Sequence, residues 1–389
     1  MKFLHTADLH IGKRIFELSL MEDQAYILRQ IVEIALEERV DALLIAGDVY
    51  DRAVPPAEGV TLLDDFLTKL LKQHIPVIMI TGNHDSPERV AFADRILEKQ
   101  GLYIAGEVGK EPKTVTLTDA FGEVDFVCLP FIKPAQAGCA SNAQAVEKLL
   151  SSLPVDKKKS RRRVLVTHYF VVGEMGESPL LSQSESDVNV GGLDAVPASL
   201  FQNFDYAALG HIHKAQKVGS GNVYYSGSAL KYSFGEALGE KSVNIVELEE
   251  KGKVSVKMRA LKPLHEMRCI RGELGELIKA ETVLSQGDGL ADYLQVTLTD
   301  REELIDPMAS LRSVYPNVLQ ILFQKNLKRE DAPYESRIEV GKKSTQELFS
   351  DFYEMLKGEP LDEKRKAIVE EAARAAQKAE GDPTCAADC

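Results

Sequence analysis

Side chains that bind divalent metal ions follow five apolar segments of this sequence, FLHT, ALLIA, VIMIT, VLVT and YAAL. The candidate ligands are Asp8, His10, Asp48, Asn83, His168, His211 and His213. Carboxylate, imidazole and amide oxygen suit Mn²⁺, Fe²⁺, Mg²⁺ or Zn²⁺, and the absence of thiolates argues against a structural zinc site. Two such ions about 3.5–4 Å apart activate water and neutralise phosphoryl oxygens. The pattern therefore predicts a dinuclear site that hydrolyses a phosphate ester.

The spacing within the motifs places polar residues on one side of the chain. Asp8 and His10 are two residues apart, as are His211 and His213, and alternate residues of an extended segment point to the same side. A glycine directly precedes three of the candidate ligands, where it would let the backbone approach closely. Any one motif is equally well explained by a polar residue that caps a loop. Five in order, each behind an apolar run, predict one shared metal centre.

The apolar segments alternate with helical patterns, which is typical of an α/β layered fold. Apolar residues recur with helical period over 25–38 and 59–72. From 215 to 257 one strand pattern follows another, so we expect a mostly antiparallel completion of the sheets. The strands predicted before that point are 2–6, 42–46, 77–81, 124–129, 164–167 and 206–209. Because active sites of open α/β sheets gather at the carboxyl ends of strands, the candidate ligands are expected to meet there.

The chain is predicted to divide into a large first domain, 1–262, and several smaller parts. Residues 263–330 alternate strand and helix patterns and predict a small α+β domain. A polar linker follows at 331–343. Residues 344–376 are predicted to form two amphipathic helices, whose apolar face docks either on this chain's own core or in a groove of a partner. The last residues, 377–389, are predicted to be disordered.

The overall composition is that of a globular protein with an acidic balance. The 389 residues are 44% hydrophobic and 28% charged, with a formal net charge of −13. This charge argues against nucleic-acid binding through overall basicity, although bound divalent ions reverse the local sign at a phosphate site. No apolar run approaches the ~20 residues that span a membrane. Five cysteines without a CxxC pair argue against a disulfide framework, so we expect a cytoplasmic protein.

Five longer motifs resemble those of the SbcD nuclease subunits, a family of the calcineurin-like metallophosphoesterase superfamily. They are FLHTADLHIGKR, IAGDVYDRAVPP, ITGNHDSPERV, FDYAALGHIH and YSGSALKYSFGE. The resemblance covers residues 1–260 in detail and the rest more loosely. It implies a four-layer α-β-β-α sandwich, with 263–330 as a DNA-capping domain and 344–376 as the segment that binds an SbcC-type ATPase. It also implies a homodimer within a heterotetramer, with helices at 59–72 and 87–98 as candidate dimer contacts.

The resemblance also implies roles for individual residues. One ion is held by Asp8, His10 and His213, a second by Asn83, His168 and His211, and Asp48 bridges them; Mn²⁺ is the preferred ion of the family. His84 is implied to stand beside the scissile phosphate and to protonate the departing oxygen.

Two carboxylates and four cations complete the list of candidate site residues. From spacing alone, Asp85 is predicted to orient His84 through its other ring nitrogen. Asp51, where archaeal and eukaryotic relatives have histidine, is expected to bear on DNA handling more than on metal binding. Cations that directly follow the metal motifs are candidate DNA contacts by position: Lys13, Arg14, Arg52 and Arg89.

The predicted function is that of a metal-dependent DNA nuclease in repair, recombination and replication. The family implies 3′→5′ exonuclease activity on double strands and endonuclease activity on single strands and hairpins. ATP would act through the partner, because this sequence has no GxxxxGK[ST] loop. The motifs by themselves specify only phosphoester hydrolysis. Two alternatives therefore stand beside the nuclease: a phosphoesterase of the same superfamily with another substrate, and a non-catalytic scaffold of the same fold.

Overall fold

The computed structural model describes residues 1–109, 111–154, 161–173, 176–181 and 195–324, with isolated positions between 349 and 369. The chain has one compact unit over Met1–Phe323 and a second over Gln324–Cys389. Apart from those isolated positions, the predicted linker, partner-binding helices and tail lie outside the described residues. Within the described part, no helix is long and apolar enough to cross a membrane.

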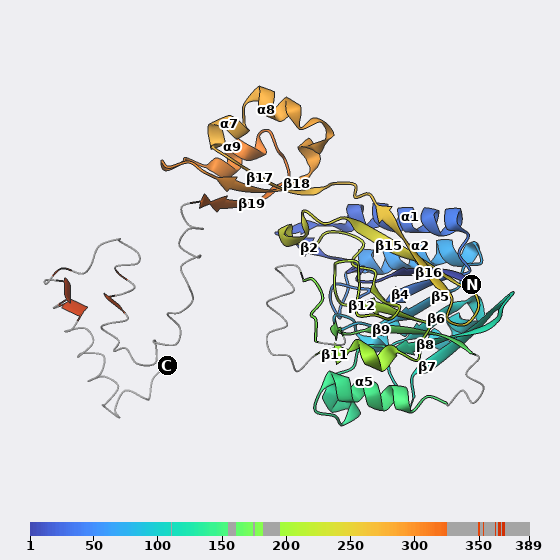
Figure 1. The fold of residues 1–389 in the computed structure, drawn as a ribbon. Helices are drawn as coiled ribbons and strands as arrows, with labels where there is room; N and C mark the ends of the chain where they lie inside the picture. Colours follow the sequence, from blue (N-terminus) through green and yellow to red (C-terminus); the bar gives the residue numbers. More distant parts are fainter. Residues whose placement is uncertain are drawn as a thin grey trace. The chain divides into compact units, whose positions relative to one another are not determined.

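The first of two six-stranded sheets has the order β16-β15-β1-β4-β5-β6 (Figure 1). Its strands are β1 (Lys2–Thr6), β4 (Ala42–Ala46), β5 (Val77–Ile80), β6 (Leu102–Ala105), β15 (Lys241–Leu248) and β16 (Val254–Leu261). β1, β4, β5 and β6 run parallel. β15 pairs antiparallel with both β1 and β16, so the predicted antiparallel completion is confirmed for this sheet.

The second sheet has the order β13-β14-β12-β9-β8-β7. Its strands are β7 (Lys113–Asp119), β8 (Gly122–Leu129), β9 (Arg162–His168), β12 (Tyr206–Gly210), β13 (Gln216–Lys217) and β14 (Val223–Tyr225). The central strands β8, β9, β12 and β14 are parallel, and the two edge strands are antiparallel to their neighbours. The carboxyl ends of β9 and β12 therefore lie side by side.

The two sheets face each other across an apolar core, and helices cover their outer faces. In β4, Leu44 packs between the sheets, whereas Leu43 and Ile45 join the core beneath α1 (Met21–Glu38) and α2 (Ala57–Lys72). This split follows from the alternation of side chains along a strand, and it explains why a strand covered on both sides is apolar throughout. On the second sheet the outer layer includes α5 (Asn142–Ser151). The predicted α-β-β-α sandwich is confirmed.

A small parallel sheet follows the sandwich in the sequence. It has the order β17-β18-β19, formed by β17 (Met267–Gly272), β18 (Tyr293–Leu298) and β19 (Val318–Phe323). Between the strands lie the short helices α7 (Leu274–Leu277), α8 (Ala280–Ser285) and α9 (Pro307–Arg312). Its buried apolar residues include Leu294, Val296 and Leu311, which form a core of their own. The alternation of strand and helix predicted for this segment agrees with the structure.

The expected helix at 87–98 is not continuous. The chain forms α3 (Pro87–Val90) and α4 (Asp94–Leu97), and the break falls at Ala93, which has a left-handed φ of 61°. The interruption leaves Phe92 79% exposed and Ile96 71% exposed. The expectation of a single helix was wrong, because a left-handed residue ends the helical hydrogen-bond pattern.

Candidate metal centre

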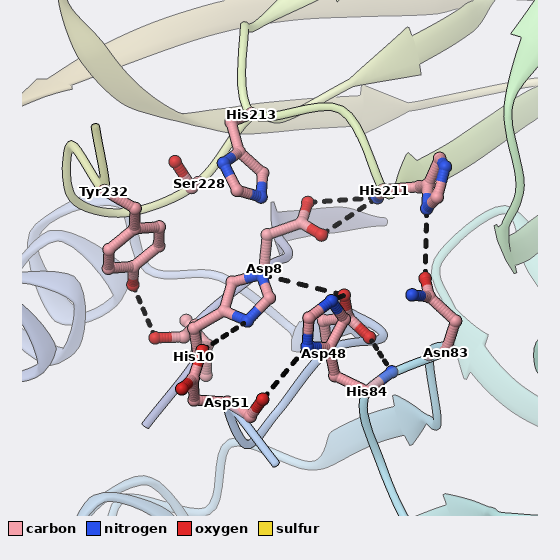
Figure 2. A network of polar contacts seen from close by, with 12 residues as sticks. Asp8, His10, Asp48, Asp51, Asn83, His84, His211, His213, Ser228 and Tyr232 are labelled. Carbon is pink, nitrogen blue, oxygen red and sulfur yellow. Dashed lines mark hydrogen bonds and ion pairs between the residues drawn. The ribbon is translucent and has the colours of Figure 1, made fainter. Parts of the chain in front are cut away.

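Strand ends from both sheets converge on one site, shown in Figure 2. From the first sheet, β1, β4 and β5 lead into the segments that carry Asp8, His10, Asp48 and Asn83. From the second sheet, β9 ends at His168, and β12 leads into His211 and His213. The structure thus brings together all seven side chains that the sequence singled out.

One group of possible ligands consists of Asp8, His10 and His213, whose ligand atoms lie within 4.8 Å of one another. The His10 side chain is buried, and neither ring nitrogen has a hydrogen-bond partner among the described residues. The nearest carboxylate oxygens, Asp48 Oδ2 and Asp51 Oδ1, are each 3.6 Å from a ring nitrogen. Buried polar atoms without a partner are costly. This arrangement fits a cation between the ring and the carboxylates.

A second group gathers around Asn83. Its Oδ1 atom lies 3.1 Å from His168 Nε2 and 3.0 Å from His211 Nδ1. Asp48 Oδ2 lies 3.3 Å from the same nitrogen of His168 and 3.6 Å from His10 Nε2. One carboxylate oxygen therefore faces both groups, which is the geometry of a ligand shared by two ions.

The backbone at the site is strained. Asp8, His10, Asp48 and His211 have φ values of 52°, 42°, 47° and 98°, which side-chain-bearing residues rarely adopt. Hydrogen bonds between the loops hold them there, from Asp8 N to Gly47 O (3.1 Å) and from His10 N to Asp48 O (3.0 Å). The amide of His211 donates to Asp8 Oδ1 at 2.9 Å and so links the two sheets. Strain of this kind collects at functional sites, where the surrounding structure enforces it.

The glycines beside the candidate ligands allow the close approach that was predicted. A Cβ atom on Gly82 would lie 2.1 Å from Asp48 Oδ1 and 2.4 Å from Asp48 N. A Cβ atom on Gly47 would lie 2.3 Å from His168 Nδ1. Real Cβ atoms essentially never come so near, so a side chain at either position would displace the neighbouring groups of the site.

His84 lies beside the candidate ligands with its ring held by a backbone group. Its Nδ1 atom is 2.9 Å from the carbonyl oxygen of Asp51, to which it can donate. Its Nε2 atom lies 4.0 Å from Asp48 Oδ2, and the side chain is 41% exposed. The ring therefore presents Nε2 towards the site with access to solvent.

The predicted partner of His84 was wrong. Asp85 does not bind the His84 ring: its carboxylate accepts hydrogen bonds from the backbone amides of Val49 (3.1 Å), Tyr50 (2.9 Å) and Gly82 (2.9 Å). Asp85 thus joins the loop after β4 to the loop after β5. Asp85 holds the backbone that carries Asp48. The Asp51 carbonyl, and not Asp85, orients the His84 ring.

The candidate DNA contacts differ in their surroundings. Lys13 Nζ pairs with Asp51 Oδ1 at 2.7 Å, so its charge is already balanced next to the site. Arg52 is 79% exposed, and its Nε lies 3.7 Å from Asp51 Oδ2. Arg14 and Arg89 are exposed as well. The three arginines are accessible to a substrate, and Asp51 connects two of the cations to the His10 side of the site.

Burial and neighbouring charges set the ionisation of the site. Burial raises the pKa of Asp8 to about 6, although His168 opposes the shift. Burial would also raise the pKa of Asp48, but His168 and His10 hold it well below its usual range. Burial lowers the pKa of His211 to about 3. Burial lowers the pKa of His168, but Asp48 and Asp8 outweigh it and raise that pKa to about 9. The carboxylates therefore attract positive charge into the site, and a divalent cation bound there would displace the proton of His168.

Sequence reasoning missed the residues that support His213. Glu236 Oε1 lies 3.4 Å from His213 Nδ1, and Lys241 Nζ lies 2.5 Å from Glu236 Oε2. Tyr232 packs its ring 5.6 Å from that of His213 and donates its hydroxyl to the carbonyl of Leu9 at 2.5 Å. The motif YSGSALKYSFGE contains two of these residues, but its spacing gave them no role.

Comparison with known proteins found two family models and relatives that span nearly the whole chain. Residues 1–215 match the calcineurin-like phosphoesterase model, and residues 263–356 match the model described as type 5 capsule protein repressor C-terminal domain. The SbcD subunit of the SbcCD nuclease from Staphylococcus saprophyticus is 33% identical over 93% of this chain and 94% of that protein. The protein of the same name from Staphylococcus epidermidis is 30% identical over 93% of this chain and 95% of its own length.

Proposed function

The chain belongs to the calcineurin-like phosphoesterase family and, within it, to the SbcD nuclease subunits, and we propose that it is a metal-dependent DNA nuclease. The observation that supports this most directly is the position of Asp48. One of its oxygens lies between His10 and His168, which belong to the two ligand groups. Such an oxygen is the feature that a two-ion phosphoesterase requires.

The proposed ligands follow from these two groups. One ion is assigned to Asp8, His10 and His213, the other to Asn83, His168 and His211, and Asp48 is shared. The ring nitrogens of buried His10, which have no hydrogen-bond partner among the residues that the structure describes, support a resident cation. The donors are carboxylate, imidazole and amide oxygen without thiolate, a set that Mn²⁺ accepts, and we assign Mn²⁺ to both positions.

The residues of the chain divide the chemical work between them. When bound, the two ions lower the pKa of water and neutralise charge on the phosphoryl oxygens. His84 is placed to hold a proton on Nε2 and give it to the departing oxygen, because its Nδ1 is engaged by the Asp51 carbonyl. That hydrogen bond fixes the ring orientation and keeps a proton on Nδ1, so Nε2 carries the proton to be transferred only when the ring is the doubly protonated imidazolium.

The DNA substrate rests on the relatives, which are named as nuclease subunits. We assign 3′→5′ exonuclease activity on duplex DNA and endonuclease activity on single strands and hairpins, with 263–330 as a capping domain. Residues 344–376 would bind an SbcC-type ATPase in the cytoplasm. A homodimer is supported by large apolar side chains exposed near α2 and α4, namely Val54, Val60, Phe92 and Ile96.

Two substitutions test the proposal on end-labelled duplex and hairpin DNA with Mn²⁺. Asp48→Ala should lose Mn²⁺ binding and cleavage together. His84→Ala should bind Mn²⁺ as the wild type does and lose cleavage by roughly 10²–10⁴-fold, the usual contribution of a general acid. His74→Ala serves as a matched control, since His74 is exposed and lies before β5, at the end opposite the ligands. Unchanged cleavage in both site variants would refute the assignment.

The two alternatives give different results in the same experiment. A phosphoesterase with another substrate would hydrolyse small phosphomonoesters with Mn²⁺ and leave linear duplex DNA intact. A non-catalytic scaffold would cleave neither, whether or not it bound the ions. Adding the ATPase and ATP to the same digestions tests whether the partner changes cleavage of blocked or closed ends.

A further inference from the structure

We propose that Glu236 and Lys241 together position His213, which makes them positioning residues for one of the two metal ions. Neither residue belongs to the predicted ligand set, and neither is part of the proposed chemistry. The proposal rests on the metal centre proposed above and adds a layer of support behind it.

The first observation is the environment of the His213 ring. Its Nδ1 atom faces Glu236 Oε1 at 3.4 Å, so Nε2 is the atom left to face Asp8 and His10. Metal-binding histidines commonly donate their second N–H to a carboxylate, which fixes the tautomer and makes the other nitrogen a better ligand. The edge of the Tyr232 ring confines the same imidazole from another side.

The second observation is that Glu236 is itself held in place. Its Oε1 atom also accepts from Ser233 Oγ at 3.2 Å and from the Tyr232 amide at 3.4 Å. Its Oε2 atom accepts from Lys241 Nζ at 2.5 Å. The Glu236 and Lys241 side chains are only 5% and 8% exposed. A buried carboxylate with four donors has little freedom, so it can fix the orientation of the ring that it contacts.

The third observation is that Lys241 holds the other end of His213. Its Nζ atom donates to the His213 carbonyl at 2.8 Å and to Ser228 Oγ at 2.7 Å. The backbone of His213 and its ring are therefore fixed by one buried ion pair. A pair that served only to stabilise the loop would not need to contact both ends of a proposed ligand.

Four variants test the proposal, with Mn²⁺ affinity and stoichiometry measured by calorimetry and electron paramagnetic resonance. Glu236→Ala should lower the affinity for one of the two ions by about 10–100-fold, the usual effect of removing a residue that hydrogen-bonds to a metal ligand. Glu236→Gln should have a smaller effect, because an amide oxygen still accepts from Nδ1–H but carries no charge. Lys241→Met should also lower the affinity for one ion, because it removes the hydrogen bond that holds the carbonyl of His213.

Asp205→Asn is the matched control. Asp205 is an equally buried carboxylate that binds the amides of Arg163 and Gly252, at the end of β12 opposite His211. This variant should lose stability but keep wild-type affinity for both ions. If Glu236→Ala fails to fold, Glu236→Gln decides, because it preserves the size of the side chain.

The outcomes separate this inference from the proposed function. The positioning role is supported if the Glu236 variants lose affinity for one ion and keep it for the second, while Asp205→Asn keeps its affinity for both. Metal affinities equal to those of Asp205→Asn would overturn it, provided that the wild type binds two ions and cleaves DNA. A wild type that binds no pair of ions and cleaves no DNA would instead refute the proposed function.

Discussion

Replacement of Gly82 by alanine should displace Asp48 and disable the site without removing any functional group. The added Cβ would lie 2.1 Å from Asp48 Oδ1 and 2.4 Å from its backbone nitrogen, whereas ordinary contacts begin at 3.4 Å. Restoring an ordinary contact with the Asp48 backbone nitrogen therefore requires the loop after β4 or the loop after β5 to move by about 1 Å. Because the contact includes backbone, rotation of the Asp48 side chain cannot relieve it.

The magnitude follows from that displacement. Misplacing a catalytic group by about 1 Å costs roughly 10²-fold in rate, and overpacking a buried site costs about 1–3 kcal/mol of stability. We therefore expect Gly82→Ala to remain folded and to lose about 10²-fold in kcat with Mn²⁺. Its affinity for Mn²⁺ should also fall, since the shared oxygen of Asp48 has moved.

The assay compares cleavage of labelled duplex DNA and hydrolysis of bis(p-nitrophenyl) phosphate, with unfolding followed by circular dichroism. Gly275→Ala is the control: Gly275 lies in α7, and a Cβ there would meet none of the described atoms within 4 Å. This variant should keep full activity and gain a little helix stability. If Gly82→Ala retained the kcat and Mn²⁺ affinity of Gly275→Ala, the geometric account of Asp48 would be refuted.

Three further predictions concern stability. Burial lowers the pKa of His5 from 6.5 to about 3, so the native state binds fewer protons than the unfolded state. This contribution to the free energy of unfolding should be full above pH 6.5 and fall by about 1.4 kcal/mol per pH unit as the pH drops below 6.5. With metal removed by a chelator, urea unfolding of His5→Gln should show a pH slope smaller than that of the wild type by this amount, because His211 contributes a slope of its own. At a free Mn²⁺ concentration about 100 times the dissociation constant, each bound ion should add about 2.7 kcal/mol to the free energy of unfolding. Identical Tm values with Mn²⁺ and with a chelator would contradict the metal centre. Arg162→Met should cost about 1.5–3 kcal/mol in denaturant titration, because it removes one of the two buried cations that pair with Asp119, the other being the amino group of Met1, and a stability equal to wild type would contradict this.

The sequence allowed the framework of the site to be predicted because the framework depends on local pattern. A run such as Ala42–Ala46, apolar at every position, indicates a strand covered on both sides, and the structure buries all five residues. The polar residues after such runs then meet where the strands end. The glycines beside the candidate ligands also allowed a prediction, because glycine has no side chain to obstruct the close approach of neighbouring backbone.

The supporting contacts could not be predicted, because they depend on how distant segments meet. Glu236 reaches His213 only through the path of the loop between β14 and β15. The partner of His84 is a backbone carbonyl, which carries no signature in the sequence. Asp85 was assigned to the wrong group for the same reason: adjacency in the chain suggested His84, whereas its carboxylate points to three amides.

The division of the ligands between two sheets bears on the order of folding. On the proposed assignment each ion takes ligands from both sheets; the first, for example, joins Asp8 after β1 to His213 after β12. A chain in which only one sheet has formed would hold an incomplete set and bind ions weakly. Tight binding would then arise only after the sheets dock, as a late event. Interactions absent from the transition state slow unfolding without speeding folding, so Mn²⁺ should lengthen the lifetime of the native state and leave its rate of formation unchanged.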